Sequence, residues 1–532
     1  MFGKKYNDFL NLIVYQIYPR SFKDTNGDGI GDLEGVTEKL DYLKELGINA
    51  IWLCPCFKSP QVDNGYDISD YMDIEPEIGS MESIKRLIAE AHNRDIKILM
   101  DLVANHTSAE HKWFKESKKS KDNPYSDYYY WFDEPQTDWQ SMWGGSAWEY
   151  CEERKQYYLH HYDVTMPDLN WDNPKVREEI NRVVDFWASM GVDGFRCDVI
   201  HEISKDLKNN IMSMGPHIHE YINGLFGRPE TDHLFTVGEC WVWNEQSFCN
   251  LTKEERKELS TMFQFQHITF GRDGKHTPKP QKLAELRDVL VHWQGVSYEN
   301  DLLYPLFTDN HDQPYFISRA GDAENKRYEL ATGIATMFYT LRGIPFIFQG
   351  QEFGTVASHF DSIDDFRDIE ALNYYKENVA ERGKEKVLEE INFGSRDNAR
   401  HPVAWDDTEY CGFSESQPWI PLNTYYKDIN LQKDKAAEKS VFNYYKSLLK
   451  VRKENKAIIY GDLKVLSKET DSYFLFEREF EGEKLIICCN FEDDNTIELP
   501  YNNLELVLSN SISRKDNDAS YKPYEAAIYK IV

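Results

Sequence analysis

The feature that most constrains this chain is a regular alternation of short apolar runs, typical of strands, with longer amphipathic stretches. Eight runs are separated by segments that have the periodicity of helices. They are Leu12–Tyr18, Ala50–Cys54, Ile96–Val103, Gly194–Val199, Leu234–Glu239, Met262–Gln266, Leu303–Phe307 and Pro345–Phe348. This alternation is typical of parallel α/β folds, and eight units are the number that closes a (β/α)8 (TIM) barrel. We therefore predict an α/β protein built on a TIM barrel.

Start and stop signals of the helices agree with this prediction. Helical periodicity covers Leu33–Leu46, Met81–Arg94 and Pro174–Met190. Asn173 stands before the proline of the third segment, as an N-cap does, and Gly191 follows its end as a stop signal.

Two regions depart from the alternation. Residues 105–171 are rich in Tyr, Trp, Asp and Gly and show little helical periodicity. Because a structureless loop of that length is improbable inside a compact domain, we interpret it as a subdomain inserted after the third strand. After about residue 459 the pattern changes to alternating strands, which predicts a C-terminal antiparallel β-sandwich. The predicted division is 1–104 (barrel), 105–171 (insert), 172–458 (barrel) and 459–532 (C-terminal domain).

Composition argues against several classes of partner. The formal net charge is −30, whereas binding of nucleic acid requires a basic surface. No apolar stretch is long enough for a membrane span, and none follows the N-terminus as in a signal peptide. Nine irregularly spaced cysteines fit reduced thiols better than disulfides or a zinc site. We expect a cytoplasmic protein with a small neutral substrate.

Polar residues that close the apolar strands are the candidates for catalysis, because the active site of such a barrel lies at the carboxyl ends of its strands. A single carboxylate there is often structural, capping a helix or pairing with a cation. A set of them at one barrel mouth is better explained by catalysis. Strands three, four, five and seven end in Asp101, in Arg196 and Asp198, in Glu239, and in His311 and Asp312.

Several segments resemble a known family. DLVANH, GFRCDV, VGE and NHD, in this order and at these spacings, resemble the four motifs of glycoside hydrolase family 13, the α-amylase family, and MPDLNW resembles a fifth at the end of its inserted domain. YQIYPRSF, DNGYDI and FDSIDDFRD look like the oligo-1,6-glucosidase and α-glucosidase subgroup. The resemblance covers most of the chain and is thinner after residue 370. It implies a TIM barrel with glycosidase chemistry.

The resemblance implies two reacting carboxylates, Asp198 as nucleophile and Glu239 as general acid/base. The residues agree: Arg196 and Asp198 lie two apart on a strand and point to the same side, so the guanidinium should keep the carboxylate ionised. Neighbouring barrel strands can place the two carboxyl groups ~5–5.5 Å apart, the separation of a retaining enzyme. Glu239 would need a raised pKa, and Trp241 and Phe195 are the candidates for an apolar environment.

Other residues would bind the terminal glucose, in subsite −1. Those implied to contact its ring are a third catalytic aspartate, two histidines and a stacking tyrosine: Asp312, His106, His311 and Tyr66. The aspartate would stabilise the transition state through the 2- and 3-hydroxyls. Asp67 would bind the 4-hydroxyl and pair with Arg400, which would close the pocket and make the enzyme exo-acting. Asp101 would support Arg196 and Tyr66 rather than react.

A calcium loop is the one cofactor site expected. Residues 24–32 carry side-chain oxygens at alternate positions and Gly at the sixth, like the start of an EF-hand, but Gly35 stands where the bidentate glutamate would be. The loop matches a calcium loop of the oligo-1,6-glucosidase subgroup. The ligands implied for this structural Ca²⁺ are Asp24, Asn26, Asp28, the carbonyl of Ile30, and Asp32. The alternative is a polar turn that binds nothing.

The residue after the nucleophile bears on the linkage. In the resembling subgroup, Val at the position of Val199 accompanies α-1,6-linked substrates, so the resemblance implies isomaltose-type substrates. Three positions depart from the subgroup: Met166 replaces Gln, Tyr315 replaces Arg, and His201 or Glu202 replaces Asn. All three are expected near the leaving group (subsite +1). We therefore expect a more apolar +1 side and a different ranking of leaving groups.

Three alternatives stay open. A transglucosidase or sucrose isomerase would use the same catalytic groups but return the glucosyl unit to a sugar. A hydrolase of phosphorylated disaccharides would need a basic +1 cluster, and Tyr315 in place of Arg argues against one. A non-catalytic partner protein of α-amylase type should lack the three carboxylates, which this chain has.

Overall fold

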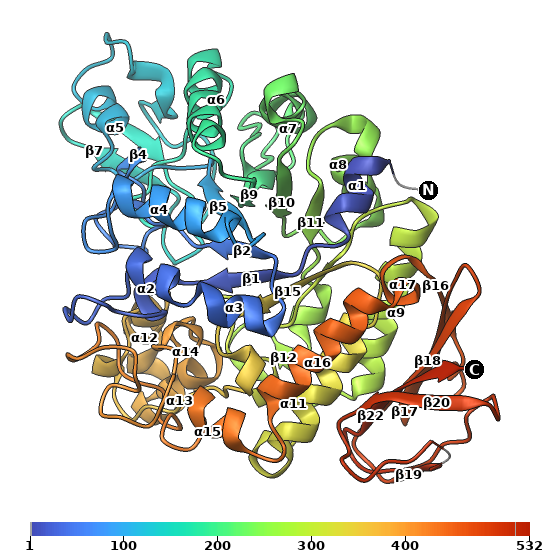
Figure 1. Cartoon of the computed structure of the whole chain (residues 1–532). Helices are drawn as coiled ribbons and strands as arrows, with labels where there is room; N and C mark the ends of the chain where they lie inside the picture. Colours follow the sequence, from blue (N-terminus) through green and yellow to red (C-terminus); the bar gives the residue numbers. More distant parts are fainter. Residues whose placement is uncertain (1–2, 517) are drawn as a thin grey trace.

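Eight parallel strands form the central sheet of the computed structural model, which describes residues 3–516 and 518–532 (Figure 1). Their order is β11-β10-β9-β5-β2-β1-β15-β14. The strands are β1 Val14–Ile17, β2 Ala50–Leu53, β5 Lys97–Val103, β9 Gly194–Asp198, β10 Phe235–Glu239, β11 Thr261–Phe263, β14 Pro305–Leu306 and β15 Ile344–Phe348. At the closing edge, the Thr261 hydroxyl donates to the Leu303 carbonyl at 2.7 Å. Each strand falls on one predicted run, so the barrel is confirmed.

Helices surround this sheet in the order that a TIM barrel requires. The main ones are α2 Leu33–Glu38, α3 Leu40–Leu46, α4 Met81–His92, α6 Pro174–Ser189, α7 Ile218–Phe226, α8 Glu245–Thr252, α9 Leu283–Glu299 and α11 Ala323–Tyr339. The helix predicted over 33–46 is two helices, because the backbone of Lys39 leaves helical geometry. As predicted, the Asn173 side chain caps α6, accepting from the Lys175 N–H, and Gly191 follows its end with φ +98°.

Residues 105–171 form a compact unit between β5 and α6 (Figure 1). It contains α5 (Lys112–Ser117) and a three-stranded antiparallel sheet in the order β6-β8-β7. The strands are β6 Trp131–Phe132, β7 Trp148–Cys151 and β8 Gln156–Leu159. A small apolar cluster that includes Trp139 and Trp148 stabilises the insert from within.

The C-terminal region is antiparallel, as expected. Its five-stranded sheet has the order β16-β17-β18-β22-β20, beside a two-stranded sheet of β19 and β21. The strands are β16 Asp462–Val465, β17 Tyr473–Phe480, β18 Glu483–Asn490, β19 Asn495–Thr496, β20 Leu504–Ser509, β21 Ser520–Tyr521 and β22 Ala526–Ile531. One face packs toward α11 and α16 (Val441–Glu454) (Figure 1). Side chains of this face join the same apolar core as the barrel helices.

A segment after β15 that the sequence did not resolve into elements folds over the barrel. It holds α12 (Ile369–Arg382), α13 (Lys384–Gly394) and α14 (Asp397–Arg400). A hairpin of β12 (Arg272–Asp273) and β13 (Thr277–Pro278) follows β11. Both segments supply side chains to the candidate site described below.

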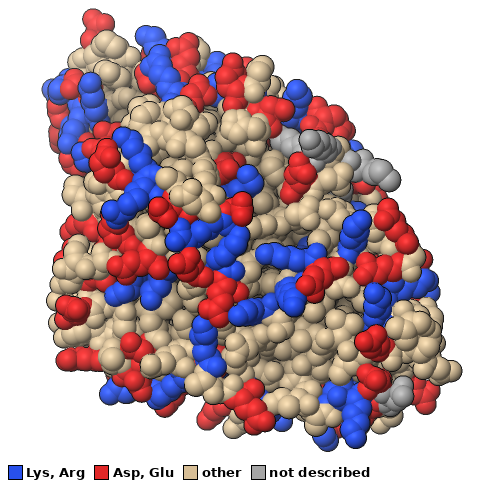
Figure 2. Space-filling view, viewed as in Figure 1, with Lys and Arg blue, Asp and Glu red and all other residues tan. Residues whose placement is uncertain are grey.

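All nine cysteines are unpaired. No helix among the described residues is long and apolar enough to cross a membrane. Acidic and basic side chains are interspersed on the face shown in Figure 2.

Candidate active site

The site is built on Arg196, in the middle of β9. The register of β5 and β9 places Asp101 opposite Arg196 and Val103 opposite Asp198. The Arg196 Nη1 donates to Asp198 Oδ1 at 2.8 Å and to Asp101 Oδ1 at 2.5 Å, and Nη2 donates to Glu239 Oε2. One guanidinium thus holds carboxylates from three neighbouring strands.

Burial and this ion pair act on Asp198 in opposite directions. Burial raises the pKa of the Asp198 carboxyl well above its usual range, and the neighbouring carboxylates of Glu239 and Asp101 add to the shift, although the Arg196 guanidinium opposes it. Burial also raises the pKa of Asp101 to about 6, against the effect of Arg196. Asp101 additionally accepts from the Trp52 indole N–H at 2.8 Å and faces the Tyr66 hydroxyl at 3.4 Å. Asp101 thus contacts both Arg196 and Tyr66, the two residues that the sequence predicts it supports.

Glu239 has a more polar environment than expected. The Trp241 indole N–H donates to Glu239 Oε1 at 2.9 Å, while Arg196 occupies Oε2. Trp241 stacks on Phe265 with ring centroids 4.1 Å apart. Phe195 is not near this carboxyl: it alternates with Arg196 along β9, so its side chain points into the apolar core on the other face of the strand. The prediction for Phe195 was therefore wrong.

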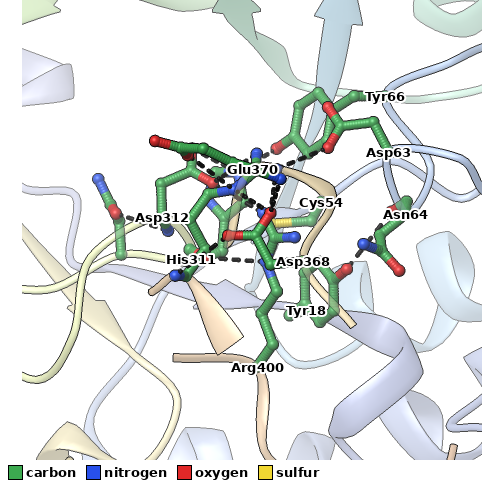
Figure 3. A network of polar contacts seen from close by, with 12 residues as sticks. Tyr18, Cys54, Asp63, Asn64, Tyr66, His311, Asp312, Asp368, Glu370 and Arg400 are labelled. Atoms are coloured by element: carbon green, nitrogen blue, oxygen red, sulfur yellow. Dashed lines mark hydrogen bonds and ion pairs between the residues drawn. The ribbon is translucent and has the colours of Figure 1, made fainter. Parts of the chain in front are cut away.

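Asp312 lies across the site on the loop after β14 (Figure 3). Arg400 Nη2 donates to its Oδ1 at 2.8 Å, and Arg396 Nη1 lies 3.7 Å from the same oxygen. Burial opposes ionisation, but His311, Arg396 and Arg400 outweigh it and hold the pKa of Asp312 well below its usual range. Burial lowers the pKa of His311 itself to about 3, so the two arginines are the permanent positive charges.

His311 and Tyr66 form one wall of the −1 region. Their rings stack with centroids 5.2 Å apart, and the Tyr66 hydroxyl lies 2.6 Å from His311 Nε2. Because Gln16 donates to Nδ1 at 2.8 Å, Nε2 carries the proton. His106 also borders the cavity; burial lowers its pKa to about 4, and its Nε2 has no hydrogen-bond partner in the described protein. That ring nitrogen is available to a sugar hydroxyl.

The predicted pair of Asp67 with Arg400 does not form. Asp67 is fully buried and holds its own loop, between β3 (Phe57–Lys58) and β4 (Asp70–Ile74), by accepting from Ser59, Val62 and Asp63. Arg400 binds Asp312 instead.

The pair that does form is Asp63 with Arg396, at 3.0 Å. Both border the cavity. Burial raises the pKa of Asp63 to about 7, against the opposing charge of Arg396. This pair lies four residues before the expected one in each segment. Each segment has two residues of the same type, Asp63 and Asp67 in one and Arg396 and Arg400 in the other, and the fold decides which of them meet.

The cavity between these groups has a volume of about 490 Å³. Predicted residues that border it are Tyr66, His106, Met166, Asp198, Val199, Glu239 and Asp312. Arg196, His311 and Arg400 lie behind them and hold the carboxylates in place. Residues that the sequence did not indicate also border it: Asp63, Met142, Trp143, Tyr162, Trp243, Thr269, Arg272, Gly274, Lys275, Gln313, Glu370 and Arg396. Among them, Trp243 was the one with a visible signal, because it follows Trp241 by two residues directly after Glu239.

Val199 borders the cavity in an unusual conformation. Its φ of +33° is left-handed, which costs a β-branched residue about 1–3 kcal/mol. This turn directly follows the nucleophile candidate and starts the short helix of Ile200–Glu202. It brings His201 and Glu202 to the cavity wall.

Tyr315 lies elsewhere than expected. It is buried, and its hydroxyl donates to the Gln349 carbonyl at 2.9 Å, away from the cavity. Positive charge near the mouth comes instead from Arg272 and Lys275, on the β12–β13 hairpin, although Lys275 is paired with Glu370. Tyr315 therefore has no effect on the charge of the +1 side.

The candidate calcium loop is compact and self-bonded. Asp24 accepts from the backbone of Asn26, Gly27 and Gly29, and Asp32 accepts from Thr25. No three His, Cys, Asp or Glu side chains gather as a metal-binding group in the part of the chain that the structure describes. The side-chain oxygens stand at alternate positions, as at the start of an EF-hand loop, but the carboxylates of Asp24 and Asp32 accept from the loop's own N–H groups.

Comparison with known proteins agrees with this architecture. Residues 16–461 match the catalytic domain of α-amylase. An oligo-1,6-glucosidase of Bacillus cereus is 43% identical over 550 residues, 98% of each chain. Among solved structures, a trehalose-6-phosphate hydrolase of Bacillus licheniformis has a TM-score of 0.93 at 38% identity, covering 98% of this chain and 99% of that one. A trehalulose synthase of Pseudomonas mesoacidophila has a TM-score of 0.93 at 37% identity with the same coverage. The chain belongs to the α-amylase family of glycoside hydrolases.

Proposed function

We propose that this protein is a retaining, exo-acting α-glucosidase that removes the terminal glucose from short, neutral α-glucosides, chiefly α-1,6-linked ones. The observation that carries the proposal is the Arg196 guanidinium, which holds Asp198 and Glu239 side by side in one cavity with Asp312. Binding of both carboxylates by one guanidinium keeps them close together, and a short separation of ~5–5.5 Å is the arrangement of a retaining enzyme.

In the first step, Asp198 attacks the anomeric carbon and Glu239 protonates the departing oxygen. Because Glu239 must turn to that oxygen, we expect its contact with Arg196 to be exchanged for one with the substrate. In the second step Glu239 removes a proton from water, which releases glucose from Asp198. Asp312, kept ionised by its arginines, would bind the ring hydroxyls most strongly in the transition state.

The exo-action follows from Asp63 and Arg396. Their ion pair joins segments 333 residues apart and lies beside Tyr66 and Asp312 at the −1 end of the cavity. A chain of sugars could not continue past it, and the paired oxygens and N–H groups suit the 4-hydroxyl of a terminal glucose.

The linkage is supported by Val199 at the cavity wall and by the relatives named oligo-1,6-glucosidase. Two other activities would use the same catalytic groups: sucrose isomerisation and hydrolysis of a phosphorylated disaccharide. The second is favoured by Arg272 at the cavity mouth, whose positive charge could bind a phosphate. Initial rates on isomaltose, maltose, sucrose and trehalose 6-phosphate separate the three.

We expect isomaltose to be the best of these substrates, with glucose as its only product. Asp198→Asn should lower turnover by about three orders of magnitude or more, with an unchanged circular dichroism spectrum. Isomers of sucrose as products would show a sucrose isomerase instead. A higher rate on trehalose 6-phosphate than on isomaltose would show a hydrolase of phosphorylated disaccharides instead. Retained turnover in Asp198→Asn would refute the nucleophile.

We further propose that residues 24–32 bind a structural Ca²⁺, with ligands from Asp24, Asn26, Asp28, Asp32 and the Ile30 carbonyl. The support is the alternate spacing of the oxygens. We also propose a cytoplasmic location, supported by the nine unpaired cysteines; activity found in the culture medium rather than in the cell extract would contradict it.

A further inference from the structure

A second cavity lies outside the active site, between the insert and the neighbouring helices α6 and α7 (Figure 1). Its volume is about 550 Å³, against about 490 Å³ for the active-site cavity, which is the size of an ordinary small-molecule site. Its border includes Tyr130 and Phe132 from the insert, Arg177 from α6, and Glu220 and Tyr221 from α7. No described residue borders both cavities, so the second one is a separate compartment.

The Tyr130 hydroxyl is the clearest sign that this cavity binds something. Tyr130 is only 6% exposed, and its hydroxyl proton has no acceptor among the described residues. The backbone group that acts on this hydroxyl, the N–H of Trp171, is itself a donor. Because buried polar groups are almost always hydrogen-bonded, the missing acceptor must come from water or from a ligand in the cavity.

Other polar groups around the cavity have unused donors and acceptors. Among the described residues, Arg177 donates only through Nη1, to the carbonyls of Trp171 and Asp172 at 2.6 and 3.2 Å, and it forms no ion pair. The Asp172 carboxylate accepts from the Tyr221 hydroxyl through Oδ1, at 2.6 Å, and Glu220 faces a histidine one turn earlier through Oε2, at 3.1 Å. Guanidinium N–H groups and two carboxylate oxygens therefore remain for a ligand.

Lys205 closes the cavity on the side of the active site, and its charge is already compensated. Its Nζ donates to Asn105 Oδ1 and to the Glu202 carbonyl, both at 2.7 Å, and lies 3.0 Å from Asp168 Oδ2. These three acceptors use the three protons of the ammonium group, so Lys205 offers a ligand only its alkyl stem. The free charges around the cavity are then the guanidinium of Arg177 and the carboxylates.

A neutral sugar fits this combination of groups. Each sugar hydroxyl both donates and accepts, so neighbouring hydroxyls can bind a carboxylate and a guanidinium at the same time. The rings of Tyr130 and Phe132 add flat apolar surface for the C–H face of a pyranose. A phosphate would meet the carboxylates at close range, and an organic cation would meet Arg177. Both signs of charge thus disfavour a strongly charged ligand.

We propose that this second cavity binds glucose or a glucose disaccharide, independently of the catalytic site. The identity of the sugar rests on the proposed glucosidase function, whereas the cavity and its unused polar groups do not. Tyr130 donates its hydroxyl proton to the sugar, Arg177 binds it from the side of α6, and the free oxygens of Asp172 and Glu220 accept from its hydroxyls. No covalent bond is made or broken there.

Binding of isomaltose to the full-length Asp198→Asn protein counts the sites. This variant should bind the disaccharide without cleaving it, so a calorimetric titration measures the stoichiometry. We expect two molecules of isomaltose per chain, with two different Kd values. Hydrolysis of α-glucosyl fluoride by the unmodified protein, measured in parallel, shows whether the catalytic site works.

Two variants on different walls, each combined with Asp198→Asn, should weaken only the second site. Tyr130→Phe removes one hydroxyl and should raise the second Kd about three- to tenfold, and Arg177→Gln should have a similar effect. Tyr158→Phe is the matched control, because the Tyr158 hydroxyl donates to the Val164 carbonyl at 2.8 Å and Tyr158 borders neither cavity. With Asp198 intact, all three variants should hydrolyse α-glucosyl fluoride at the unmodified rate.

The outcomes separate the two claims. One isomaltose per chain, or a second Kd that Tyr130→Phe and Arg177→Gln leave unchanged, would overturn the second site and leave the proposed function intact. If two molecules bind and the variants raise one Kd, but α-glucosyl fluoride is not turned over, the proposed function fails and the second site stands.

Discussion

Arg196 illustrates how one buried charge organises a site at the scale of single residues. It holds Asp101, Asp198 and Glu239, which would repel one another without it. Removing one partner of a buried ion pair typically costs about 3–5 kcal/mol because an uncompensated charge remains. A side chain of fixed planar shape, with donors on both arms, is required to orient two carboxylates on neighbouring strands.

Two variants test whether Asp63 or Asp67 binds the non-reducing end of the substrate. Asp63→Asn keeps the side-chain shape but removes one of the two carboxylates that Arg396 binds, so we expect kcat/KM on isomaltose to fall about 10- to 100-fold. Asp368 still neutralises Arg396 in this variant, which limits the loss of Tm. Asp67→Asn is the matched control. Since Asp67 accepts only from its own loop, this variant should lower Tm and affect kcat/KM less. The assignment fails if Asp67→Asn is the more damaging of the two to kcat/KM.

At the scale of elements, the insert is fastened to the barrel beside the catalytic strand. His161, after β8, lies 2.7 Å from Glu202, and the Tyr162 hydroxyl faces the same carboxyl at 3.3 Å. Burial opposes charge on Glu202, but His161, with His201 and Lys205, lowers its pKa to about 2. Burial likewise opposes charge on His161, and Glu202 raises its pKa.

These shifts define a pH window. The folding stability that ionised Glu202 contributes is fully present above the ordinary Glu pKa of about 4.3 and is lost as pH falls toward about 2. The folding stability that protonated His161 contributes is fully present below the ordinary His pKa of about 6.5 and is lost as pH rises through its raised pKa. We expect Glu202→Gln to cost about 3–5 kcal/mol in this window. The drop in Tm should therefore be largest near pH 5.5 and smaller at pH 3 and pH 9.

A second His–Glu pair of the chain provides the control. His217 and Glu220 are 3.1 Å apart but more than half exposed, so Glu220→Gln should change stability little at any pH. A pH-independent drop in Tm for Glu202→Gln would show that the buried pair is not ionised.

At the scale of the whole molecule, contacts between distant parts of the chain close the fold. The loop of residues 24–32 touches a segment about 390 residues later: the Ser414 hydroxyl donates to Asp24 at 2.6 Å, and the Trp419 N–H donates to the Gly29 carbonyl at 3.0 Å. Gly29, with φ +87°, admits this approach, because a Cβ there would meet the Gln417 carbonyl at 2.2 Å. An ion in the loop would stabilise the whole chain.

Calcium should therefore raise Tm of the intact protein. At about 100 times its Kd, a ligand that binds only the folded state contributes about 2.7 kcal/mol. We expect Tm in 1 mM CaCl₂ to exceed Tm in EDTA, and Asp28→Asn to abolish the difference without loss of kcat, since the loop lies outside the cavity. Identical Tm values in calcium and EDTA would refute calcium binding.

The sequence by itself determined the eight strands, the carboxylates at their ends and the family, because periodicity and strand order are local properties that set which side chains reach the barrel mouth. It did not determine which of two equivalent residues would face the substrate. The packing of loops and of helices α12 to α14 decides which of these residues reach the cavity. It brings Asp63 and Arg396 there rather than Asp67 and Arg400, and it keeps Tyr315 away. These segments meet across hundreds of residues, and only packing decides which side chain each contact selects. The exposed tryptophans after Glu239 could be read in the sequence, but only the tertiary structure placed them with Met142 and Trp143 around the cavity.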